Sequence, residues 1–516
     1  MKDLLLSLGV SDHGSPVNGA LSARAEPGRF AEIATTLSQV HRLPLSLLYA
    51  TDDRMQHGTF GVHAVFSRDR GEWLLLSTAL PSADPRYPSL TRTIPSAQWY
   101  ERYSTDMFGI IADGHPDPRR LVLHENMPEN VHPLCKDFAW NTRLPLAKIP
   151  YPMHRVKGEG IYQIPVGPIH AGIIEPGHFR FNVAGERIIT LEGKLFFTHK
   201  GCEKLLDGKT LSSALPFIER ISGDCAASHA LAFCQAAEAI AGCDVPARAH
   251  DLRTLLCELE RITMHIFDIG NIIGNGTGYT VLAAHGFRLR EEMMRLSQSV
   301  TGNRFWRGMI IPGGCNRDLE KEMLFTIGSR VETCVSDMFH LFHMAMSSDA
   351  VRERLETSGI LRHEAGIAYG AVGIAARASG IDRDVRRDHP YASYPRCSFA
   401  VALETGGDVY ARLLVRYKEL KASQEMVRHL LAHLSPGSVH VPCSAANGTG
   451  LSAVESWRGE LLSVLHMREG VVDRCVVRDP SFCNWPLFGE IGPGNIVPDF
   501  PLCNKSLNLS YSGTDL

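Results

Sequence analysis

The chain has 516 residues, of which 44% are hydrophobic, 21% charged and 8% aromatic, and its formal net charge is -3. A charge this close to neutral gives no electrostatic case for binding nucleic acid or an anionic membrane surface. No stretch approaches the roughly 18 apolar residues of a membrane-spanning helix, and the N-terminal apolar run is too short for an export signal. We therefore expect about two or three domains in a protein that is soluble or peripheral on a partner.

The first 140 residues predict an α+β domain. Residues 29–41 have the apolar spacing of a helix, whereas 61–69 and 72–80 are typical of strands. Residues 141–160 are basic and broken by prolines, so they predict a linker.

From residue 161 onward, long apolar helices predict a second domain, 161–516, built as a mainly α-helical bundle with small β-sheets. Two of these helices are expected to end at glycines, 227–242 at Gly242 and 253–270 at Gly270. Residues 460–481 predict two strands joined at 468–470. The other expected helices are 286–300, 318–347 and 408–434.

The thirteen cysteines contain no CxxC pair. Their spacing therefore indicates no metal cluster, and a disulfide framework belongs to short exported chains. We expect free, mostly buried thiols in a reducing cytoplasm.

The loop GPIHAGIIEPGHFRF (167–181) places His170, Glu175 and His178 between glycines and prolines. A carboxylate between two imidazoles suits proton transfer, because burial can bring their pKa values toward neutrality. The alternative is the edge of a β-hairpin with solvated polar side chains.

Two further motifs favour structural roles. In ELERITMH, Glu258, Arg261 and His265 are three or four residues apart on one helix, which predicts an internal ion network. The stretch GNGTG (274–278) follows a helix rather than a strand, so its context excludes a dinucleotide-binding loop.

Six motifs in order carry a resemblance to a known family. The first, ERYSTDMFGIIADGHPDPRRLVL, resembles the signature of the 30-kDa subunit of respiratory complex I. The others resemble the complex I 49-kDa subunit and its relative, the large subunit of NiFe hydrogenases: VGPIHAGIIEPGHFRF, HKGCEKL, RTLLCELERITMH, SGIDRDVRRDHPYASY and SWRGELL. The fused order is that of large subunits in energy-converting hydrogenases such as formate hydrogenlyase and hydrogenase-4.

That family holds its NiFe centre with four thiolates, in RxCGxC and DPCxxC motifs, because sulfur-bridged nickel and iron need soft ligands. Here the four positions are Ser222, Cys225, Ser481 and Asn484, so one thiolate remains. Glu203 matches the family's magnesium-site glutamate. These vestigial positions predict that the chain binds no NiFe centre and no other metal or cofactor.

The resemblance nevertheless implies a redox site. The C-terminal segment resembles complex I, whereas the loop with Glu175 follows the hydrogenase form, in which a matching glutamate relays protons. Glu175 with His170 or His178 would supply protons to an acceptor, a quinone, and Asp224 and Asp384 are further candidates.

The resemblance also implies partners and a location. These are a small subunit like the complex I 20-kDa subunit, which carries an iron–sulfur cluster, and membrane subunits like those of complex I, including antiporter-like ones. The complex would pump ions and lie on the inner, cytoplasmic face of a prokaryotic cell membrane. Two alternatives stay open: an active NiFe hydrogenase with unusual ligands, and a non-catalytic subunit that couples the small subunit to the membrane arm.

Overall fold

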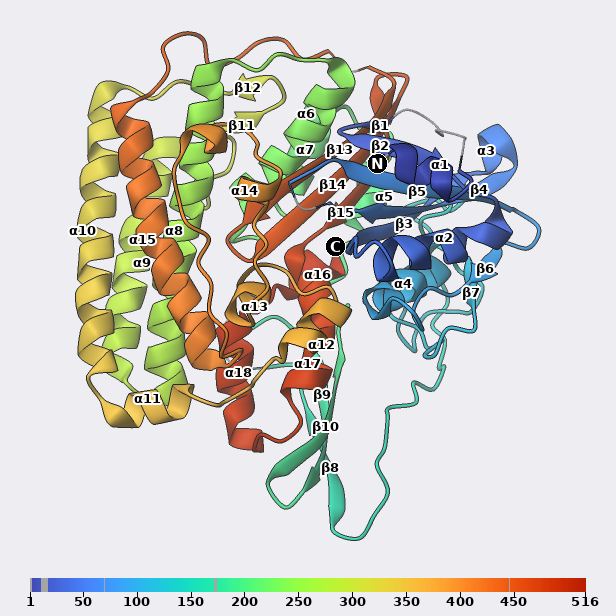
Figure 1. Ribbon diagram of the computed structural model, residues 1–516, viewed down its shortest axis with the longest axis horizontal. Coiled ribbons are helices and arrows are strands. Elements are labelled where there is room, and N and C mark those ends of the chain that lie inside the picture. Colours follow the sequence, from blue (N-terminus) through green and yellow to red (C-terminus); the bar gives the residue numbers. More distant parts are fainter. Residues whose placement is uncertain (1, 11–16, 69, 171–173, 445) are drawn as a thin grey trace.

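The computed structural model describes residues 2–10, 17–68, 70–170, 174–444 and 446–516. Long helices stand side by side at one end of the molecule, strands occupy the middle, and the N-terminal α+β part lies at the other end (Figure 1). The fold class predicted from the sequence is confirmed.

The four longest helices have 22 to 31 residues. In chain order the helices are α1 (Lys2–Ser7), α2 (Pro27–Gln39), α3 (Arg54–His57), α4 (Gln98–Phe108), α5 (Cys202–Leu206), α6 (Leu211–Ile218), α7 (Ala226–Ala241), α8 (Ala247–Thr277), α9 (Thr280–Thr301), α10 (Lys321–Met346), α11 (Asp349–Leu355), α12 (His363–Ala368), α13 (Gly373–Ala378), α14 (Val385–Asp388), α15 (Val409–Ala432), α16 (Pro480–Asn484), α17 (Phe488–Ile491), α18 (Phe500–Leu507) and α19 (Tyr511–Asp515).

The strands are β1 (Val17–Asn18), β2 (Ala20–Arg24), β3 (Leu45–Asp53), β4 (Thr59–Phe66), β5 (Trp73–Pro81), β6 (Arg86–Pro88), β7 (Ile111–Asp113), β8 (Ile161–Val166), β9 (His178–Ala184), β10 (Arg187–Lys194), β11 (Ile310–Ile311), β12 (Gly314–Cys315), β13 (Gly448–Ser456), β14 (Gly459–Arg468) and β15 (Val471–Arg478). The largest sheet has eight strands in the order β15-β14-β13-β1-β2-β5-β4-β3. It joins N-terminal to C-terminal strands, because β1 pairs in parallel with β13. The two predicted domains therefore share one sheet, and the boundaries between them stay a prediction.

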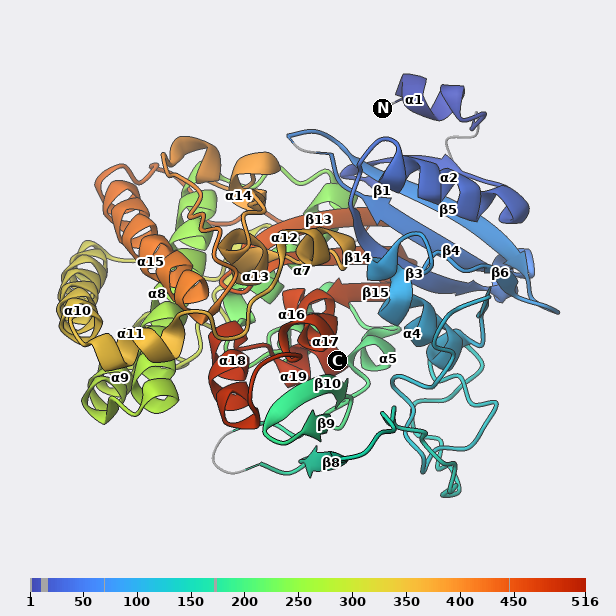
Figure 2. The ribbon, with the colours of Figure 1, turned by 60° about the horizontal axis from the view of Figure 1, so that its bottom comes forward.

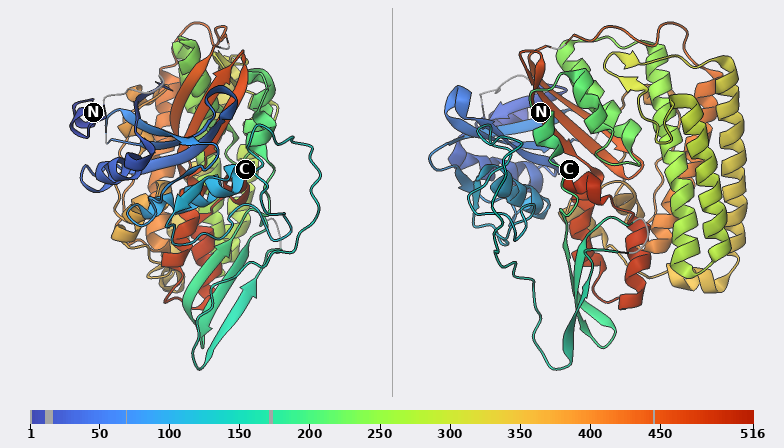
Figure 3. Two further views of the ribbon diagram at one scale, coloured as in Figure 1. Left: turned by 90° about the vertical axis from the view of Figure 1, so that its right-hand side faces the viewer. Right: turned by 180° about the vertical axis from the view of Figure 1, so that it is seen from behind.

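The helical bundle consists of α8, α9, α10 and α15 (Figures 1 and 3). The predicted end at Gly242 is confirmed, since this residue caps α7 with φ +61. The predicted end at Gly270 is wrong, because α8 continues to Thr277. A Cβ at Gly270 would lie 2.9 Å from the Cα of Gly286 on α9, so this glycine permits close helix packing.

The predicted ion network is confirmed inside this bundle. Nε2 of His265 lies 2.8 Å from Oε2 of Glu419, and Nε of Arg261 lies 3.3 Å from Oε2 of Glu258. All four side chains are buried. Their mutual pairing offsets the cost of placing charges in the core.

A three-stranded antiparallel sheet, β10-β9-β8, projects from the lower edge of the molecule (Figures 1 and 2). The chain reaches it through residues 114–160, which contain no helix or strand. All thirteen cysteines are free and most are buried, as expected. Among the described residues, no helix combines the length and apolar character that a membrane crossing needs.

Candidate functional site

Two of the four vestigial metal positions are joined by a chain of serines. The hydroxyl of Ser222, in the loop before α7, donates to Oδ1 of Asp224 at 2.8 Å and lies 2.9 Å from the hydroxyl of Ser510. The backbone N–H of Ser510 donates to the hydroxyl of Ser481, on α16, at 2.9 Å. Ser222, Ser481 and Ser510 are all buried.

Asp224 is held from the other side by the turn between β13 and β14. Nη1 and Nη2 of Arg458 each donate to its carboxylate at 2.8 Å, and the indole N–H of Trp457 donates to its carbonyl at 2.9 Å. Burial opposes ionisation of Asp224, but the charge and hydrogen bonds of Arg458 outweigh it, so the pKa of Asp224 lies below its ordinary value. The SWRGELL motif thus fixes the loop that carries Ser222.

The two remaining positions, Asn484 and Cys225, are held within the chain as well. The side-chain amide of Asn484 accepts from the backbone N–H of Val372 at 3.1 Å and donates to its carbonyl at 3.1 Å. The thiol of Cys225 is fully buried, and burial raises its pKa well above the ordinary value. We call Ser222, Cys225, Ser481 and Asn484, together with Ser510, the serine corner.

The donor set of the serine corner does not fit a NiFe centre. Two hydroxyls and an amide already have partners within the chain, and they are hard ligands. Cys225 is the one thiol among the four positions. These five residues do not supply the four soft ligands that bridged nickel and iron require.

Glu203, for which the resemblance predicts a former magnesium site, forms an ion pair in this structure. Oε1 of Glu203 lies 3.1 Å from Nη1 of Arg474 on β15, and the hydroxyl of Tyr103 on α4 donates to Oε2 at 2.5 Å. A guanidinium in this place repels a second cation. Glu203 now ties the N-terminal helix α4 to the shared sheet.

Of the loop candidates, Glu175 adjoins the serine corner. Its Oε2 accepts the backbone N–H of Ser512 at 3.0 Å, and the hydroxyls of Ser512 and Ser510 lie 3.4 Å apart. Residues 171–173 of the same loop lie outside the described residues.

The two histidines bind their own loop. Nε2 of His170 lies 2.7 Å from the carbonyl of Gly177, and Nδ1 of His178 lies 3.2 Å from the carbonyl of Gly167. Burial lowers the pKa of His178. Within the described residues neither imidazole bonds to Glu175, so the structure does not assemble the predicted carboxylate–imidazole group.

Asp384 lies in the ion network instead. Its carboxylate pairs with Arg386 at 2.6 Å and with Arg377 at 3.7 Å, and it caps the first turn of α14. Burial opposes its ionisation, yet Arg386 keeps its pKa below the ordinary value. No hydrogen bond among the described residues joins it to the serine corner.

Glu260 is a further residue of the site that sequence reasoning missed. Its carboxylate accepts the N–H of Ala227 at 2.7 Å and the hydroxyl of Ser228 at 2.6 Å, in the first turn of α7. Burial raises its pKa to about 7. Glu260 and Asp224 line the same cavity of about 10 Å³, which has room for about one water molecule. Glu260 lies in the ELERITMH motif, but its side chain is on a different face of the helix from the predicted network of Glu258 and Arg261.

Three families match successive parts of the chain. Residues 23–143 match the respiratory-chain NADH dehydrogenase 30 Kd subunit, 200–269 the nickel-dependent hydrogenases, and 276–445 the respiratory-chain NADH dehydrogenase 49 Kd subunit.

Curated relatives match over most of their length. Hydrogenase-4 component G of Escherichia coli is 34% identical over 91% of this chain and 83% of its own. Formate hydrogenlyase subunit 5 of the same organism is 31% identical over 98% of this chain and 90% of its own. The C/D fusion protein of the NADH-quinone oxidoreductase of Methylococcus capsulatus is 27% identical over 78% of this chain and 73% of its own.

Proposed function

The chain belongs to the family of fused oxidoreductase large subunits that contains hydrogenase-4 component G and formate hydrogenlyase subunit 5, and we propose that it transfers electrons to a quinone without a NiFe centre. A partner subunit's iron–sulfur cluster supplies the electrons, and antiporter-like membrane subunits use the reaction to pump ions. The complex lies on the cytoplasmic face of the membrane.

One observation carries this proposal: the hydrogen bonds that join Ser222 to Ser510 and Ser510 to Ser481. These hydrogen bonds engage the hydroxyls of the residues that align with hydrogenase thiolates. The corner therefore offers no set of soft ligands for a metal that would carry out hydrogen chemistry. The similarity to a relative named for quinone reduction supports quinone as the acceptor.

Reduction of a quinone to a quinol consumes two electrons and two protons, so the site needs groups that can release protons near neutral pH. Glu260 has its pKa raised by burial to about 7, which suits this task. Glu175 accepts the backbone N–H of Ser512, whose hydroxyl lies 3.4 Å from that of Ser510 in the corner. Asp224 is kept ionised by Arg458 and so acts by positioning the corner rather than by giving up a proton.

The test is quinone reduction by the intact complex carrying Glu175→Gln, Glu260→Gln or Asp224→Asn. We expect the two glutamine variants to lose about 100-fold or more in turnover, because a positioned acid contributes about 100- to 10,000-fold. A serine variant outside the corner, Ser299→Ala, is the control. Full turnover in all three variants would make a catalytic site at this corner untenable.

That result would instead favour a non-catalytic coupling subunit. The hydrogen bonds that pair Ser222, Ser510 and Asn484 within the chain favour this second candidate, since a rigid joint needs no free group. Stoichiometric nickel with hydrogen oxidation would favour the third candidate, a hydrogenase with unusual ligands.

A further inference from the structure

The chain reaches the three-stranded sheet through an extended segment that is basic and exposed. Residues 140–157 contain Arg143, Lys148, Arg155 and Lys157 and no aspartate or glutamate. All four cations are exposed, and none of them makes an ion pair or a side-chain hydrogen bond with a described residue. We call residues 140–157 the basic strap. The chain here follows the lower right edge of the molecule down to the start of β8 (Figure 1).

Backbone hydrogen bonds fix the path of the basic strap. The N–H of Ala147 donates to the carbonyl of Asn126 at 2.8 Å. Farther along, the N–H of His154 donates to Oε2 of Glu192, on β10, at 2.8 Å. The strap contains no helix or strand, yet it is tied at both places to the part of the molecule that it crosses. Its exposed side chains are therefore held on a defined side of the molecule.

The strap has an inner and an outer face. From residue 147 to residue 154 the odd-numbered side chains are half-buried and the even-numbered ones are exposed. On the inner face, Nζ of Lys194 lies 4.2 Å from the ring centroid of Tyr151, which packs the strap against β10. Two large apolar side chains of the strap are exposed with the cations: Trp140 is 72% exposed and Leu146 is 85% exposed. The outer face is therefore both basic and partly apolar.

The carboxylates next to the strap do not neutralise its cations. Oε2 of Glu125 lies 2.5 Å from Nζ of Lys194, and Oε1 of Glu192 lies 2.5 Å from Nη1 of Arg119. Each of these carboxylates is thus matched by a cation outside the strap. Glu159 follows the strap in sequence, which still leaves a local excess of positive charge. The net charge of -3 for the whole chain does not reveal this excess.

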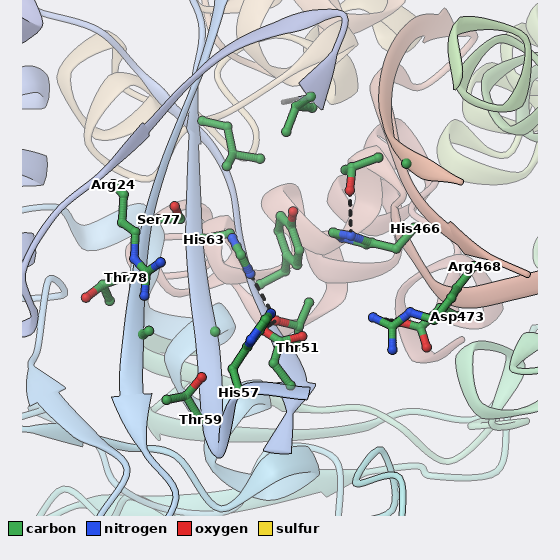
Figure 4. A pocket seen from close by; sticks show the side chains of 18 of the residues that line it. Arg24, Thr51, His57, Thr59, His63, Ser77, Thr78, His466, Arg468 and Asp473 are labelled. Carbon is green, nitrogen blue, oxygen red and sulfur yellow. Dashed lines mark hydrogen bonds and ion pairs between the residues drawn. The ribbon is translucent and has the colours of Figure 1, made fainter. Parts of the chain in front are cut away.

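The charged cavity in the eight-stranded sheet shows the contrast. Arg24 and Arg468 line this cavity of about 500 Å³ (Figure 4). Asp53 and Asp473 line it as well, so its charges are mixed in sign. In the strap, cations of one sign stand beside an exposed tryptophan and an exposed leucine. Clusters of lysine and arginine with such apolar neighbours are typical of segments that bind anionic bilayers, where tryptophan favours the headgroup level.

We propose that the outer face of the basic strap lies on an anionic phospholipid bilayer. The four cations meet the phosphates of the headgroups, and Trp140 and Leu146 enter the headgroup region. A bilayer fits these two apolar side chains because it is fluid and needs no preformed pocket to receive them. The proposal rests on the membrane location proposed above and names the segment of this chain that makes the contact.

The test uses the full chain with vesicles of equal parts phosphatidylglycerol and phosphatidylcholine. Trp140 supplies the signal, because the other five tryptophans of the chain are buried. These vesicles should shield Trp140 from quenching by acrylamide, and added salt should reverse the protection because it screens exposed charges. Vesicles of phosphatidylcholine alone should give no protection. Protection by neither kind of vesicle, or equal protection by both, would overturn the proposal.

A charge variant tests the cations of the strap. It combines Arg143→Gln, Lys148→Gln, Arg155→Gln and Lys157→Gln. Each cation near an anionic surface contributes about fivefold to the affinity, so co-sedimentation should show binding weakened about 100-fold or more. The matched control removes four exposed cations that form no ion pair with described residues, by Arg42→Gln, Arg68→Gln, Lys321→Gln and Lys421→Gln. It should bind as the wild type does, and an equal loss in both variants would contradict the proposal.

Two further measurements separate a bilayer from an acidic protein surface. Leu146→Gln should weaken vesicle binding about fivefold, because the apolar contact is lost, whereas Phe325→Gln, at a position 79% exposed on α10, should not change it. Poly-glutamate in place of vesicles should leave Trp140 open to acrylamide. Equal protection by poly-glutamate would assign the strap to an acidic protein and overturn the bilayer. Vesicle binding needs no electron transfer, so its failure and the failure of quinone reduction are distinguishable.

Discussion

The serine corner and the part of the eight-stranded sheet around Tyr49 and His63 both hold buried polar atoms, yet they differ in whether those atoms have partners. In the corner, Ser222, Ser481 and Asn484 bond to groups of the same chain. In the sheet, the hydroxyl of Tyr49 and Nδ1 of His63 are buried and have no such partner among the described residues.

The difference separates a buried polar cluster whose groups are paired within the chain from a part of the sheet that keeps unpaired buried groups. Replacing thiolates by hydroxyls would leave unsatisfied groups unless the surroundings supply hydrogen bonds, and in the corner they do. The two regions have similar polarity, but only the serine corner pairs its polar groups within the chain.

The largest effect is expected from Arg458→Met. This change removes both hydrogen bonds from the guanidinium to Asp224 and the ion pair with its carboxylate, which should cost about 3–5 kcal/mol in the free energy of unfolding. Urea denaturation measures it. The control is Arg295→Met, which breaks an exposed pair with Glu291 and should cost less than about 1 kcal/mol. Equal effects would show that the corner does not depend on its internal pairing.

A second prediction concerns pH. The pKa of Glu260 is raised by burial from 4.5 to about 7, so its contribution to stability is complete below pH 4.5 and is lost as pH rises through 7. The loss is on the order of 3 kcal/mol. Glu260→Gln cannot ionise, so its unfolding free energy should fall less than that of the wild type between pH 5 and pH 8. Parallel pH profiles for the two proteins would contradict the assignment.

In the eight-stranded sheet, Gly61→Ala should have an effect of intermediate size on stability. A Cβ at Gly61 would lie 2.3 Å from Oγ1 of Thr51 and 2.6 Å from Nε2 of His63. The displacement of Thr51 and His63 should cost about 1–3 kcal/mol in the free energy of unfolding. Gly489→Ala is the control, because its Cβ would meet no atom within 4 Å. Unchanged stability in Gly61→Ala would contradict the close packing of Gly61 against Thr51 and His63.

The smallest expected effect sharpens the comparison directly. Ser510→Ala removes a hydroxyl that contacts Ser222 and accepts the N–H of Gly513, so it should cost about 1–2 kcal/mol. Tyr49→Phe removes a hydroxyl with no partner among the described residues and should cost nothing. Thermal unfolding of the two variants under the same conditions compares their stabilities. A larger loss of stability in Tyr49→Phe than in Ser510→Ala would contradict the prediction.

The helices were predictable because apolar periodicity and glycine caps are local signals. The predicted stop at Gly270 failed because this glycine serves packing against Gly286, a contact that sequence spacing does not encode. The shared sheet was also missed. The pairing of β1 with β13 joins residues more than 400 apart in the sequence, and no local pattern specifies such a partner.

For the site, the motifs located Ser222, Ser481 and Asn484 but did not reveal their hydrogen-bond partners. Ser510 and Arg458 complete the corner from distant segments. Glu260 was passed over because its role depends on burial and on the first turn of α7, neither of which a residue pattern reveals. His63 and His466 come from β4 and β14, each the second strand from one edge of the sheet, and their ring centroids lie 6.2 Å apart because the sheet curls.

The nickel content of the purified, intact complex tests the central claim most directly. Because the serine corner supplies hydrogen-bonded hydroxyls and an amide in place of thiolates, elemental analysis should find no nickel above background in preparations that still reduce quinone. One nickel atom per chain would contradict the account, since it would require a soft ligand set that this corner does not contain.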